Sequence, residues 1–555
     1  MTTSDPTVTR ETTYGVVIVG GGPVGLLLAY QLKKFGTSVC VLEQHKMKAQ
    51  DAYGRAIALF PRTLELLDQL GVVEPMLQLG FACRNSLING SNIPGRVWTF
   101  MENIKGTTYD FTLVLRQMYT EAILRDKLQS VGGVYFQGME CVRFDCEEET
   151  APDEFPVTST FRDAATGETF RLKSKYLIGA DGGGSFVRRH AGIPFEGDTS
   201  EDRWIRVDGI VETDMPITRA YGAIESETHG NVLWAPHDHG ATRIGYAYSS
   251  EIAAKYPDGV TQEVAVQEAI EAMKPFKVSF GEVHWWTLYT IGQRITKTFS
   301  SANSRVFLCG DAAHTHSSGA AQGLNTGIHD AVNLGWKLAL HIRGLTQPEV
   351  LETYTAERLT AVQNPIDYDK DIAMLMSSKW PAWYTGDPNA DPHLVLGRIF
   401  NEAAAFNTGL GISYAANVLN DLESVSYINN NSHCDLTPGS RLPDVELKMP
   451  ATNQLETLQA LQRYLRDTAP ELTSHKSIRW LTITAAVGCS PYEALGMNPL
   501  GDAYFDAAKP LAHGRLGVDV EEGAAVILRP DGLIGATGKV DGCWIREYFS
   551  RVLYL

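Results

Sequence analysis

The sequence predicts an α/β protein of two or three domains, and three observations support that prediction. Near the N-terminus an apolar strand runs into a glycine-rich turn, a helix and a second strand, which is typical of a Rossmann-like unit. Residues 205–295 alternate apolar and polar side chains, which indicates a mostly antiparallel sheet inserted into that unit. From residue 437 onward, strands and a terminal helix indicate a further small α/β domain. A chain of 555 residues is long enough for this organisation.

The first strand, residues 14–19, leads into a glycine-rich turn that has the spacing of a dinucleotide-binding motif. The turn reads Gly20-Gly21-Gly22-Pro23-Val24-Gly25. In such a motif Gly20 permits the tight turn, and Gly22 lets a pyrophosphate approach the backbone. Gly25 allows the following helix to pack closely on the strand. The motif therefore predicts a bound dinucleotide rather than a turn without function.

The residues that follow complete the motif. We expect a helix over residues 26–35 and a second strand over residues 38–42, which ends at Glu43. A carboxylate about 20 residues after the glycines accepts hydrogen bonds from ribose hydroxyls. Glu43 also argues against a nucleotide with a 2′-phosphate at this site, because the like charges would repel each other.

Two further stretches place an acidic residue at the tip of a buried strand. Residues 176–180 lead into Asp181 and a run of glycines, and residues 306–309 lead into Gly310 and Asp311. In the second case a loop of small residues enters a long helix from about Gln322. The free N–H groups at the start of a helix attract an anionic ring or a phosphate. Both stretches therefore predict contacts with a polar cofactor.

The remaining elements follow from hydrophobic periodicity and from turn residues. Helices are predicted from residue 61 to residue 70, after a strand end near residue 113, and over residues 261–273, 322–342, 349–363 and 544–553. Strands are predicted within residues 134–180 and over residues 205–212, 231–235, 242–248, 282–294, 477–484, 524–529 and 534–537. Residues 379–392 are predicted to form a loop.

Composition excludes several classes of protein. The net charge of −17 argues against a nucleic acid or an anionic membrane as the partner. The 8 cysteines form no C-x-x-C pair and no metal-ligand spacing, which favours free thiols and predicts no metal site. The N-terminus lacks the layout of a signal peptide. We therefore expect a cytoplasmic protein.

Three motifs, at Gly20–Gly25, at Asp181 and at Gly310–Asp311, together resemble the single-component FAD-dependent aromatic monooxygenases of the p-hydroxybenzoate hydroxylase type. The sequence His314-Thr-His-Ser is most similar to the phenol hydroxylase (phenol 2-monooxygenase) branch. That branch carries a C-terminal thioredoxin-like domain, which here would lack a redox C-x-x-C pair and would serve packing or dimer contacts.

The resemblance implies a Rossmann-like FAD-binding domain of the glutathione reductase type with an inserted, mostly antiparallel substrate domain. The FAD-binding domain would comprise residues 1–80, 110–195 and 296–375, the substrate domain 81–109 and 196–295, a helical connection 376–436, and the thioredoxin-like domain 437–555. Cofactor contacts would come from Gly20, Gly22, Pro23, Val24, Gly25, Glu43, Gln44, Arg55, Gln117, Asp181, Gly310, Asp311, Gln322, Gly323, Leu324 and Asn325.

The activity that the resemblance implies is hydroxylation of a phenolic or other aromatic substrate. NADPH or NADH would reduce the flavin, O2 would add to it, and the C4a-hydroperoxyflavin would pass one oxygen to the substrate. Epoxidation, Baeyer–Villiger oxidation or dearomatising oxidation of a polyketide-like metabolite is the alternative on the same scaffold. A flavin-binding protein without turnover is a third reading, against which the complete set of cofactor motifs argues.

Polar groups near the substrate would come from Tyr289, His237, Arg243 and Tyr246. The phenol hydroxylase branch has an acidic residue where this chain has Ile57, an arginine where it has His237 and, approximately, a tyrosine where it has Gly245. Relatives commonly carry proline where this chain has Ser318. These departures point away from simple phenol as the substrate. A homodimer is a further expectation.

Overall fold

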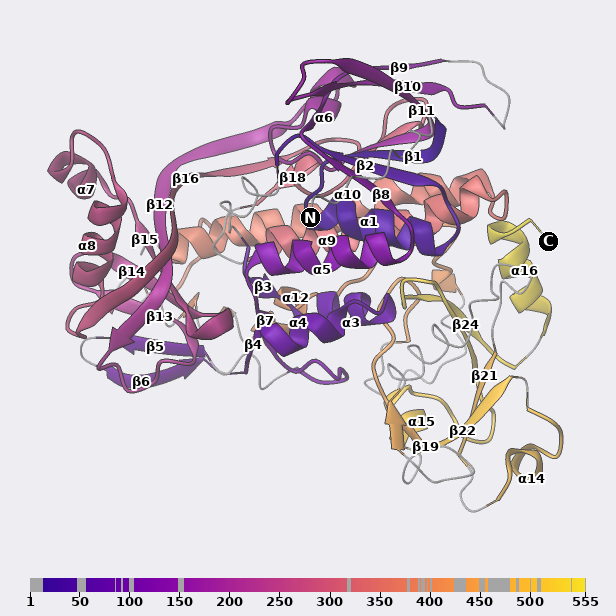
Figure 1. Cartoon of the computed structure of the whole chain (residues 1–555). Helices are drawn as coiled ribbons and strands as arrows, with labels where there is room; N and C mark the ends of the chain where they lie inside the picture. Colours follow the sequence, from indigo (N-terminus) through magenta and orange to yellow (C-terminus); the bar gives the residue numbers. More distant parts are fainter. Residues whose placement is uncertain are drawn as a thin grey trace, which may run out of the picture.

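The computed structural model describes most of the chain. The described residues are 13–46, 56–84, 86–90, 93–98, 104–147, 154–316, 321–376, 380–387, 390, 395–396, 398–399, 402–423, 436–448, 455–457, 480–485, 489–499, 501–506, 511–540 and 542–554. Figure 1 shows a central unit of sheet and long helices, a second sheet with its own helices to one side, and a small C-terminal unit. We call these the first unit, the sheet unit and the C-terminal unit.

The first unit is built on a seven-stranded sheet in which β1 and β11 lie at the centre. The strand order is β8-β2-β1-β11-β10-β9, with β17 paired to β11. The bounds are β1 (Thr13–Val19), β2 (Val39–Glu43), β8 (Val134–Gln137), β9 (Met139–Cys146), β10 (Val157–Asp163), β11 (Thr169–Gly179) and β17 (Val306–Leu308). The five strands β8, β2, β1, β11 and β17 run parallel. Their carboxyl ends bring the three predicted motifs to one edge of the sheet.

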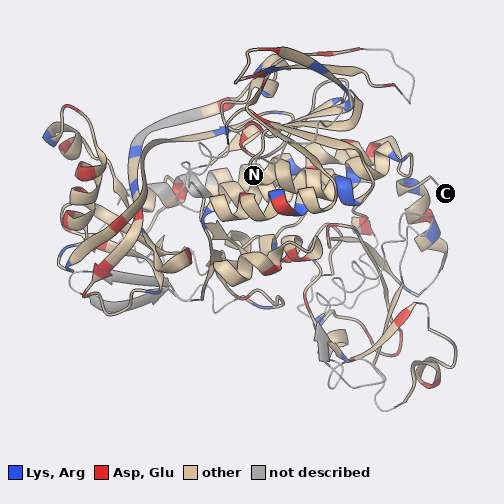
Figure 2. Cartoon of the chain, in the orientation of Figure 1, with Lys and Arg blue, Asp and Glu red and all other residues tan. Residues whose placement is uncertain are grey.

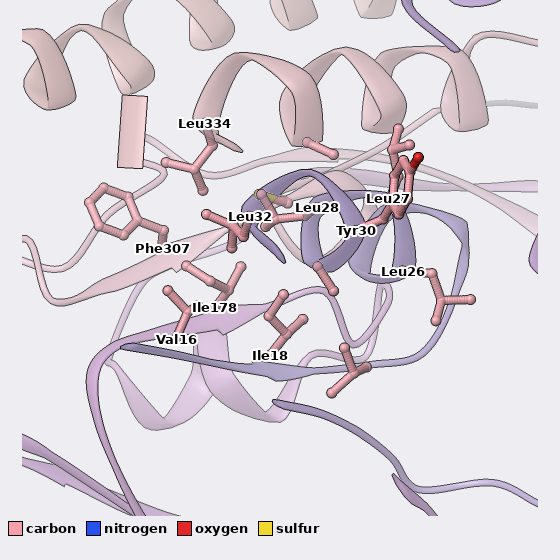
Figure 3. Close-up of a cluster of buried hydrophobic side chains, with 14 of the residues drawn as sticks. Val16, Ile18, Leu26, Leu27, Leu28, Tyr30, Leu32, Ile178, Phe307 and Leu334 are labelled. Carbon is pink, nitrogen blue, oxygen red and sulfur yellow. The ribbon is translucent and has the colours of Figure 1, made fainter. Parts of the chain in front are cut away.

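Four long helices cover this sheet: α1 (Pro23–Lys34), α5 (Gln117–Ser130), α9 (Gln322–Ile342) and α10 (Pro348–Met376). Helix α1 begins at Pro23, three residues before the predicted start, because proline suits the first helical position. Its leucines pack against Val16 and Ile18 of β1 and against Ile178 of β11, and all of these side chains are buried (Figure 3). This apolar contact fixes the direction in which α1 leaves the glycine turn.

The sheet unit consists of eight strands in the order β18-β16-β12-β15-β14-β13-β5-β6. Their bounds are β5 (Ser86–Gly90), β6 (Ile93–Trp98), β12 (Glu196–Thr213), β13 (Tyr221–Ser226), β14 (Gly230–Pro236), β15 (Thr242–Ala247), β16 (Val278–Ile295) and β18 (His314–Thr315). Strands β12 and β16 have 18 residues each and run from the sheet unit toward the first unit (Figure 1). The sequence predicted only the second half of β12, because its first residues carry no alternating pattern.

The two faces of this sheet differ. One face packs on α8 (Gln262–Ala272), where Ile205, Ile244 and Trp234 join the alanines of the helix in an apolar core. Helix α7 (Ser250–Lys255) lies beside it. The other face, which we call the inward face, contacts the first unit through Leu233 and Ala235. Because side chains alternate along a strand, each strand contributes to both faces.

A three-stranded sheet joins the two units. It consists of β3 (Ala58–Leu59), β7 (Thr112–Val114) and β4 (Phe81–Cys83), in that order. Helices α3 (Pro61–Gln69) and α4 (Val73–Leu79) follow β3 along the chain, whereas α6 (Phe186–His190) packs beside β9 and β11 of the first unit. Ile57, which precedes β3, is buried against the inward face. The residues next to β3 therefore lie between the sheet unit and the helices of the first unit.

The C-terminal unit contains a four-stranded sheet, a hairpin and a terminal helix. Its elements are β19 (Glu446–Lys448), β20 (Leu455–Thr457), β21 (Leu481–Thr484), α14 (Pro491–Leu495), β22 (Asp502–Asp506), α15 (Leu511–Arg515), β23 (Ala525–Leu528), β24 (Ile534–Gly538) and α16 (Gly542–Val552). The predicted hairpin of β23 and β24 is confirmed. Before this unit lies the short helix α12 (Ala404–Asn407).

Charges of both signs are spread over all three units (Figure 2). Within the described residues, no helix has the length and hydropathy that a membrane span requires. The same part of the chain contains no group of three or more metal-ligating side chains.

A buried ionic network fastens the hairpin to the first unit. Glu357 of α10 accepts hydrogen bonds from Arg529 at 2.6 and 2.9 Å and from Lys337 of α9 at 2.7 Å. Arg529 also pairs with Asp531 at 2.7 Å, and the Trp336 ring N–H donates to that same carboxylate. Burial alone would raise the pKa of Glu357, but the positive charges of Arg529 and Lys337 hold it well below its usual value. Glu357 is therefore the ionised centre of the contact.

We expect Glu357→Gln to destabilise the protein by about 3–5 kcal/mol, because buried Lys337 would lose its charged partner and buried Arg529 would lose one of its two. The measurement is the urea midpoint of the purified protein. Glu352→Gln on the same helix is the control, since the Glu352 side chain is exposed and its loss should leave the midpoint unchanged. Equal midpoints for Glu357→Gln and the wild type would contradict the role of the network.

Candidate active site

The three glycines of the dinucleotide motif, Gly20, Gly22 and Gly25, have different roles in the turn after β1. A Cβ on Gly20, whose φ is 110°, would lie 2.2 Å from the Ala180 carbonyl oxygen. A Cβ on Gly25 would lie 2.1 Å from the Gly20 oxygen, so this residue permits the close approach of α1. A Cβ on Gly22 would meet no atom of the described residues within 4 Å. The space outside Gly22 is therefore open to a phosphate.

Glu43 lies beside this turn with its carboxylate oriented by backbone donors. Its Oε2 accepts a hydrogen bond from the Gly21 N–H at 2.7 Å, and its Oε1 accepts one from the His45 N–H at 2.8 Å. Each carboxylate oxygen can accept a second bond, as a ribose hydroxyl would require. The neighbouring Gln44 is exposed, and its amide instead contacts the His45 ring at 3.0 Å.

Val24 joins the turn to the second cofactor loop. A Cβ on Gly327 would lie 2.7 Å from a methyl group of Val24, and a Cβ on Gly310 would lie 3.1 Å from the same methyl group. The first turn of α1, which begins at Pro23, is thus packed directly on the Gly310 loop and on α9. The two motifs lie side by side although nearly 300 residues separate them.

An arginine joins the Asp181 loop to the Gly310 loop. Asp181 accepts hydrogen bonds from the Ser185 hydroxyl at 2.5 Å and from the Val187 N–H at 3.1 Å, which order the start of α6. Burial raises the pKa of Asp181. The Arg188 guanidinium donates to the carbonyl oxygens of Ala312 and Gly183, at 2.9 Å each. Arg188 therefore fixes the Asp181 loop against the Asp311 loop.

The start of α9 presents backbone donors rather than side chains. Its N-cap residue, Ala321, has a left-handed conformation, and its side chain makes no capping hydrogen bond. The Asp311 side chain is exposed, and its Oδ1 would lie 4.0 Å from a Cβ on Gly323. Uncapped N–H groups at a helix start attract negative charge. Gly323 and Leu324 belong to this first turn, and their contact with the flavin stays a prediction.

The amide side chains of this first turn bind protein groups. Gln322 donates to the Asn407 carbonyl at 3.0 Å. Asn325 accepts from the Phe60 N–H at 2.8 Å and donates to the Ala58 carbonyl at 3.0 Å. The side chain of Asn325 therefore fastens β3 to α9.

The Gln117 side chain likewise forms hydrogen bonds with protein groups. Its Oε1 accepts from the Ala56 N–H at 3.3 Å, and its Nε2 donates to Glu121 at 2.7 Å. The backbone N–H of Gln117 donates to the Ala56 carbonyl as well. Gln117 thereby holds the residue that follows Arg55. Arg55 itself, like Ser317 and Ser318, lies outside the described residues.

The Gly310 loop is held by a fully buried carboxylate that the sequence analysis did not single out. Asp330 of α9 accepts hydrogen bonds from the Gly310 N–H at 2.9 Å, the His314 ring at 2.6 Å and Arg358 of α10 at 2.7 Å. Burial alone would raise the pKa of Asp330, but His314 and Arg358 outweigh it and lower the pKa to about 2. The His314 ring also contacts His316 at 3.1 Å. The carboxylate thus orders the loop from Gly310 to His316.

The predicted substrate residues fall on both faces of the sheet unit. Arg243, Trp285 and Tyr289 belong to the inward face, where the Arg243 guanidinium lies 5.0 Å from the Trp285 ring centre. Arg243 is fully buried and pairs with Asp208 at 2.6 Å. Arg243 therefore positions the inward face through an ion pair.

Tyr246 lies on the opposite face. Its hydroxyl donates to the Ala265 carbonyl of α8 at 2.8 Å, and burial raises its pKa well above the usual value. The prediction of a catalytic Tyr246 has no support in this placement. The physical reason is the two-residue period of a strand, which turns residue 246 away from the side on which residue 243 lies.

His237 is enclosed between two ion pairs. It is fully buried, with Nδ1 3.4 Å from Asp238 and Nε2 3.8 Å from Asp208. Asp238 in turn pairs with Arg116 at 2.6 Å, just before α5 of the first unit. The His237 ring is therefore covered on both nitrogen-bearing sides. The sequence did not single out Asp238 and Arg116, whose only signal was the carboxylate next to His237.

We expect Gly22→Val to weaken FAD binding and Gly25→Val to lower the stability of the protein. Gly22→Val should keep the melting temperature of the cofactor-free protein but bind FAD more than about tenfold more weakly, because the new methyl groups occupy the phosphate space. Gly25→Val should lower the melting temperature itself, since its Cβ collides with backbone. Visible absorbance per protein and thermal unfolding give the two readouts. Normal flavin content in Gly22→Val would contradict the assignment.

We expect Asp330→Asn to lower the free energy of unfolding by about 3–5 kcal/mol, because Arg358 stays buried without its counterion. The same substitution should lower the flavin content. Asp311→Asn is the matched control, with weaker FAD binding and unchanged stability, since Asp311 is exposed. The pKa of Asp330 is depressed, so its contribution is present above about pH 4 and is lost as the pH falls toward 2. Urea midpoints between pH 3 and pH 7 measure this. An Asp330→Asn deficit that is independent of pH would contradict the account.

Comparison with known proteins agrees with this geometry. The family described as "FAD binding domain" matches residues 13–368. An FAD-dependent monooxygenase of Aspergillus terreus, terD, is 30% identical over 446 residues, which are 78% of this chain and 70% of that protein. The 3-hydroxybenzoate 4-monooxygenase of Comamonas testosteroni is 31% identical over 431 residues, covering 73% and 66%.

Solved structures show the same fold over nearly the whole chain. The ternary complex of aklavinone-11 hydroxylase with FAD and aklavinone has a TM-score of 0.70 at 20% identity, and covers 98% of this chain and 99% of the other. Within this chain, the open space at Gly22, the oriented carboxylate of Glu43, the exposed Asp311 and the uncapped start of α9 fit the phosphates, hydroxyls and ring of FAD. The chain belongs to the FAD-binding-domain family and is an FAD-dependent monooxygenase.

Proposed function

We propose that this enzyme uses NADPH or NADH and O2 to hydroxylate a phenolic or otherwise electron-rich aromatic substrate. The observation that carries the proposal is the inward face, which presents Tyr221, Tyr289 and Trp285 beside Arg206 and Arg243. Rings and cations of this kind suit an aromatic molecule with acidic hydroxyl groups. Related proteins named 3-hydroxybenzoate 4-monooxygenase and 6-methylpretetramide 4-monooxygenase act on aromatic rings, which supports the same class.

The residues of the chain bind and orient the reactants. Bound FAD supplies the exchange of hydride and the activation of O2. Glu43 and Asp311 would accept hydrogen bonds from cofactor hydroxyls, and the N–H groups in the first turn of α9 would stabilise negative charge on the flavin. Ile57 and Val114 close the apolar contact with the inward face and exclude water from it. The polar groups of that face then orient the substrate ring.

A second candidate is oxygen insertion into a larger polyketide-like ring, by epoxidation, Baeyer–Villiger or dearomatising oxidation. The observation that favours it is the apolar character around Ile57, which packs with Leu233 and Ala235 where related phenol hydroxylases have an acid. The Ile57 side chain cannot act as a base that takes the proton of a phenol. The products separate the two candidates.

We also propose that the protein is cytoplasmic and forms a homodimer, with a thioredoxin-like C-terminal unit that serves packing. The absence of a C-x-x-C pair argues against a redox role for this unit. Its hairpin is tied to α9 and α10 through Glu357 and Arg529, which supports a structural role.

The test is turnover with isotopic oxygen. We expect the purified holoenzyme to oxidise NADPH or NADH faster with a suitable phenol than without it, and to place one atom of labelled O2 in the product. Mass spectrometry of the product and trapping of hydrogen peroxide measure this outcome. A ring hydroxyl supports the first candidate, and a ring-expanded or epoxide product supports the second. Flavin-bound protein that incorporates no oxygen with any aromatic substrate would overturn both.

A further inference from the structure

Two histidines of the Gly310 loop form a hydrogen-bonded chain with Asp330. Nε2 of His314 lies 2.6 Å from Oδ2 of Asp330, and Nδ1 of His314 lies 3.1 Å from Nε2 of His316. The two rings stand edge to face, with their centres 5.1 Å apart. The contacts therefore lead from a buried carboxylate through both nitrogens of one imidazole to a second imidazole, and they end at Nδ1 of His316.

Nδ1 of His316 is the open end of this chain. The atom is buried, and within the part of the chain that the structure describes it has no hydrogen-bond partner. Buried polar atoms are nearly always paired, because an unpaired one loses its hydration without compensation. His316 lies between Asp311 and the start of α9, the two stretches that were predicted to contact the flavin. We therefore expect the missing partner to be a molecule bound at this loop.

The carboxylate of Asp330 determines where the protons of the chain can lie. Burial acts to raise its pKa, but His314 and Arg358 outweigh burial and lower the pKa to about 2. The carboxylate is therefore ionised and only accepts hydrogen bonds. Its contact with His314 places a proton on Nε2 of that ring. The proton between the two rings can lie either on Nδ1 of His314 or on Nε2 of His316.

These two positions define two states of the histidine pair, which differ by one proton. With the bridging proton on Nε2 of His316 and both rings neutral, Nδ1 of His316 is a hydrogen-bond acceptor. With the bridging proton on Nδ1 of His314, that ring is charged, and neutral His316 carries its hydrogen on Nδ1 and is a donor. A proton that leaves Nδ1 of His316 is thus replaced across the ring contact, and the charge on His314 disappears.

The surrounding groups favour His314 as the place of the charge. Burial, His314 and Arg358 outweigh Asp330 and lower the pKa of His316 to about 3, so that this ring stays neutral. The carboxylate of Asp330 contacts His314 directly, while Arg358 of α10 binds the other carboxylate oxygen at 2.7 Å. Phe299 covers His314 with an apolar ring, at 5.7 Å between centres. The pair can therefore hold one proton whose charge lies beside Asp330.

Three further titratable groups near Asp330 are neutral. Burial raises the pKa of the Cys309 thiol and of the Tyr354 hydroxyl, and it lowers the pKa of His329. These groups therefore add no charge to the surroundings of the pair at working pH.

We propose that His316 is a proton donor in the reaction and that its Nδ1 gives one proton to the oxygen atom of O2 that leaves as water. The assignment rests on the proposed function. There, one NADPH or NADH, one proton, O2 and the aromatic substrate give the oxidised nicotinamide, the hydroxylated product and water. In the proposed step the Nδ1–H bond of His316 breaks and an O–H bond of the departing water forms. The bridging proton then moves from His314 to Nε2 of His316, so His314 and Asp330 are positioning residues.

The first test compares His316→Gln with the wild type. The glutamine amide can replace Nε2 and keep the contact with His314, but it offers nothing in place of Nδ1. In the wild type we expect the amount of product per NADPH or NADH oxidised to fall between about pH 6 and about pH 9, because the pair loses its proton. In His316→Gln this ratio should be at least about tenfold lower at the acidic end and independent of pH, with the O2 recovered as hydrogen peroxide.

A second readout requires neither substrate nor turnover. Bound FAD is reduced without oxygen in weak buffer, and an indicator dye counts the protons taken up. Negative charge on the reduced ring should draw a proton onto a neutral histidine pair nearby. The wild type should therefore take up more protons per FAD than free FAD does at the same pH, and His316→Gln should lose this excess. The wild-type measurement decides the matter even if His316→Gln does not fold.

His341→Gln is the matched control. His341 lies in the last turn of α9, its Nδ1 is likewise buried without a partner among the described residues, and burial lowers its pKa. Its loss should leave proton uptake and the pH profile unchanged. Wild-type uptake equal to that of free FAD would overturn the proposal. A wild-type pH profile in His316→Gln would also overturn it, whether or not that variant is less stable, because a merely structural role lowers activity at every pH.

Failure of this proposal can be distinguished from failure of the proposed function. A wild type that places no labelled oxygen in any aromatic product would overturn the proposed function and, with it, the role of His316. A wild type that does incorporate oxygen, together with a His316→Gln variant that forms product equally well at each pH, would leave the monooxygenase function intact and overturn the role of His316 alone.

Discussion

The hydrogen bonds of the Asp330 carboxylate fix the Gly310 loop relative to the start of α9. This carboxylate is fully buried and accepts hydrogen bonds from the Gly310 backbone, from His314 and from Arg358, so that one side chain of α9 joins the loop after β17 to α10. Arg358 extends the contact by donating to the Tyr414 hydroxyl at 2.9 Å. A buried carboxylate is stable only when such partners compensate for its lost hydration. Because the same helix carries the uncapped turn at Gln322, the loop and the helix start keep one fixed relation.

Helix α9 also makes the contacts that hold the sheet unit and the C-terminal unit. Near its start, Asn325 binds the backbone beside β3 and so places Ile57 against the inward face. Near its end, Lys337 and Trp336 bind Glu357 and Asp531, and through them the hairpin of the C-terminal unit. The sheet unit is attached separately, where Asp238 pairs with Arg116 before α5. Buried polar contacts on either side of the apolar contact at Ile57 therefore position the inward face against the first unit.

The sequence predicted the parts of the site that local backbone geometry determines. Gly20 and Gly25 must be glycine because backbone oxygens lie about 2 Å from where a Cβ would be, and such positions leave a recognisable spacing. Asp330 was not singled out, because its partners are distant in the sequence and no local pattern marks a buried ion pair. Tyr246 was assigned to the site because register cannot be read to one residue from sequence, and a shift of one residue changes the face. His237 was identified as a polar group of this region, but its enclosure by Asp208 and Asp238 depends on the pairing of three strands.

The most direct measurement of the central claim is a crystal structure of the FAD-bound enzyme. The account predicts the pyrophosphate over Gly22, a ribose hydroxyl on Glu43, and the N1–C2=O edge of the ring against the N–H groups at the start of α9, with the ring facing the inward face of the sheet unit. A ring whose N1–C2=O edge lies on another element, or a pyrophosphate held away from the Gly20–Gly25 turn, would contradict it.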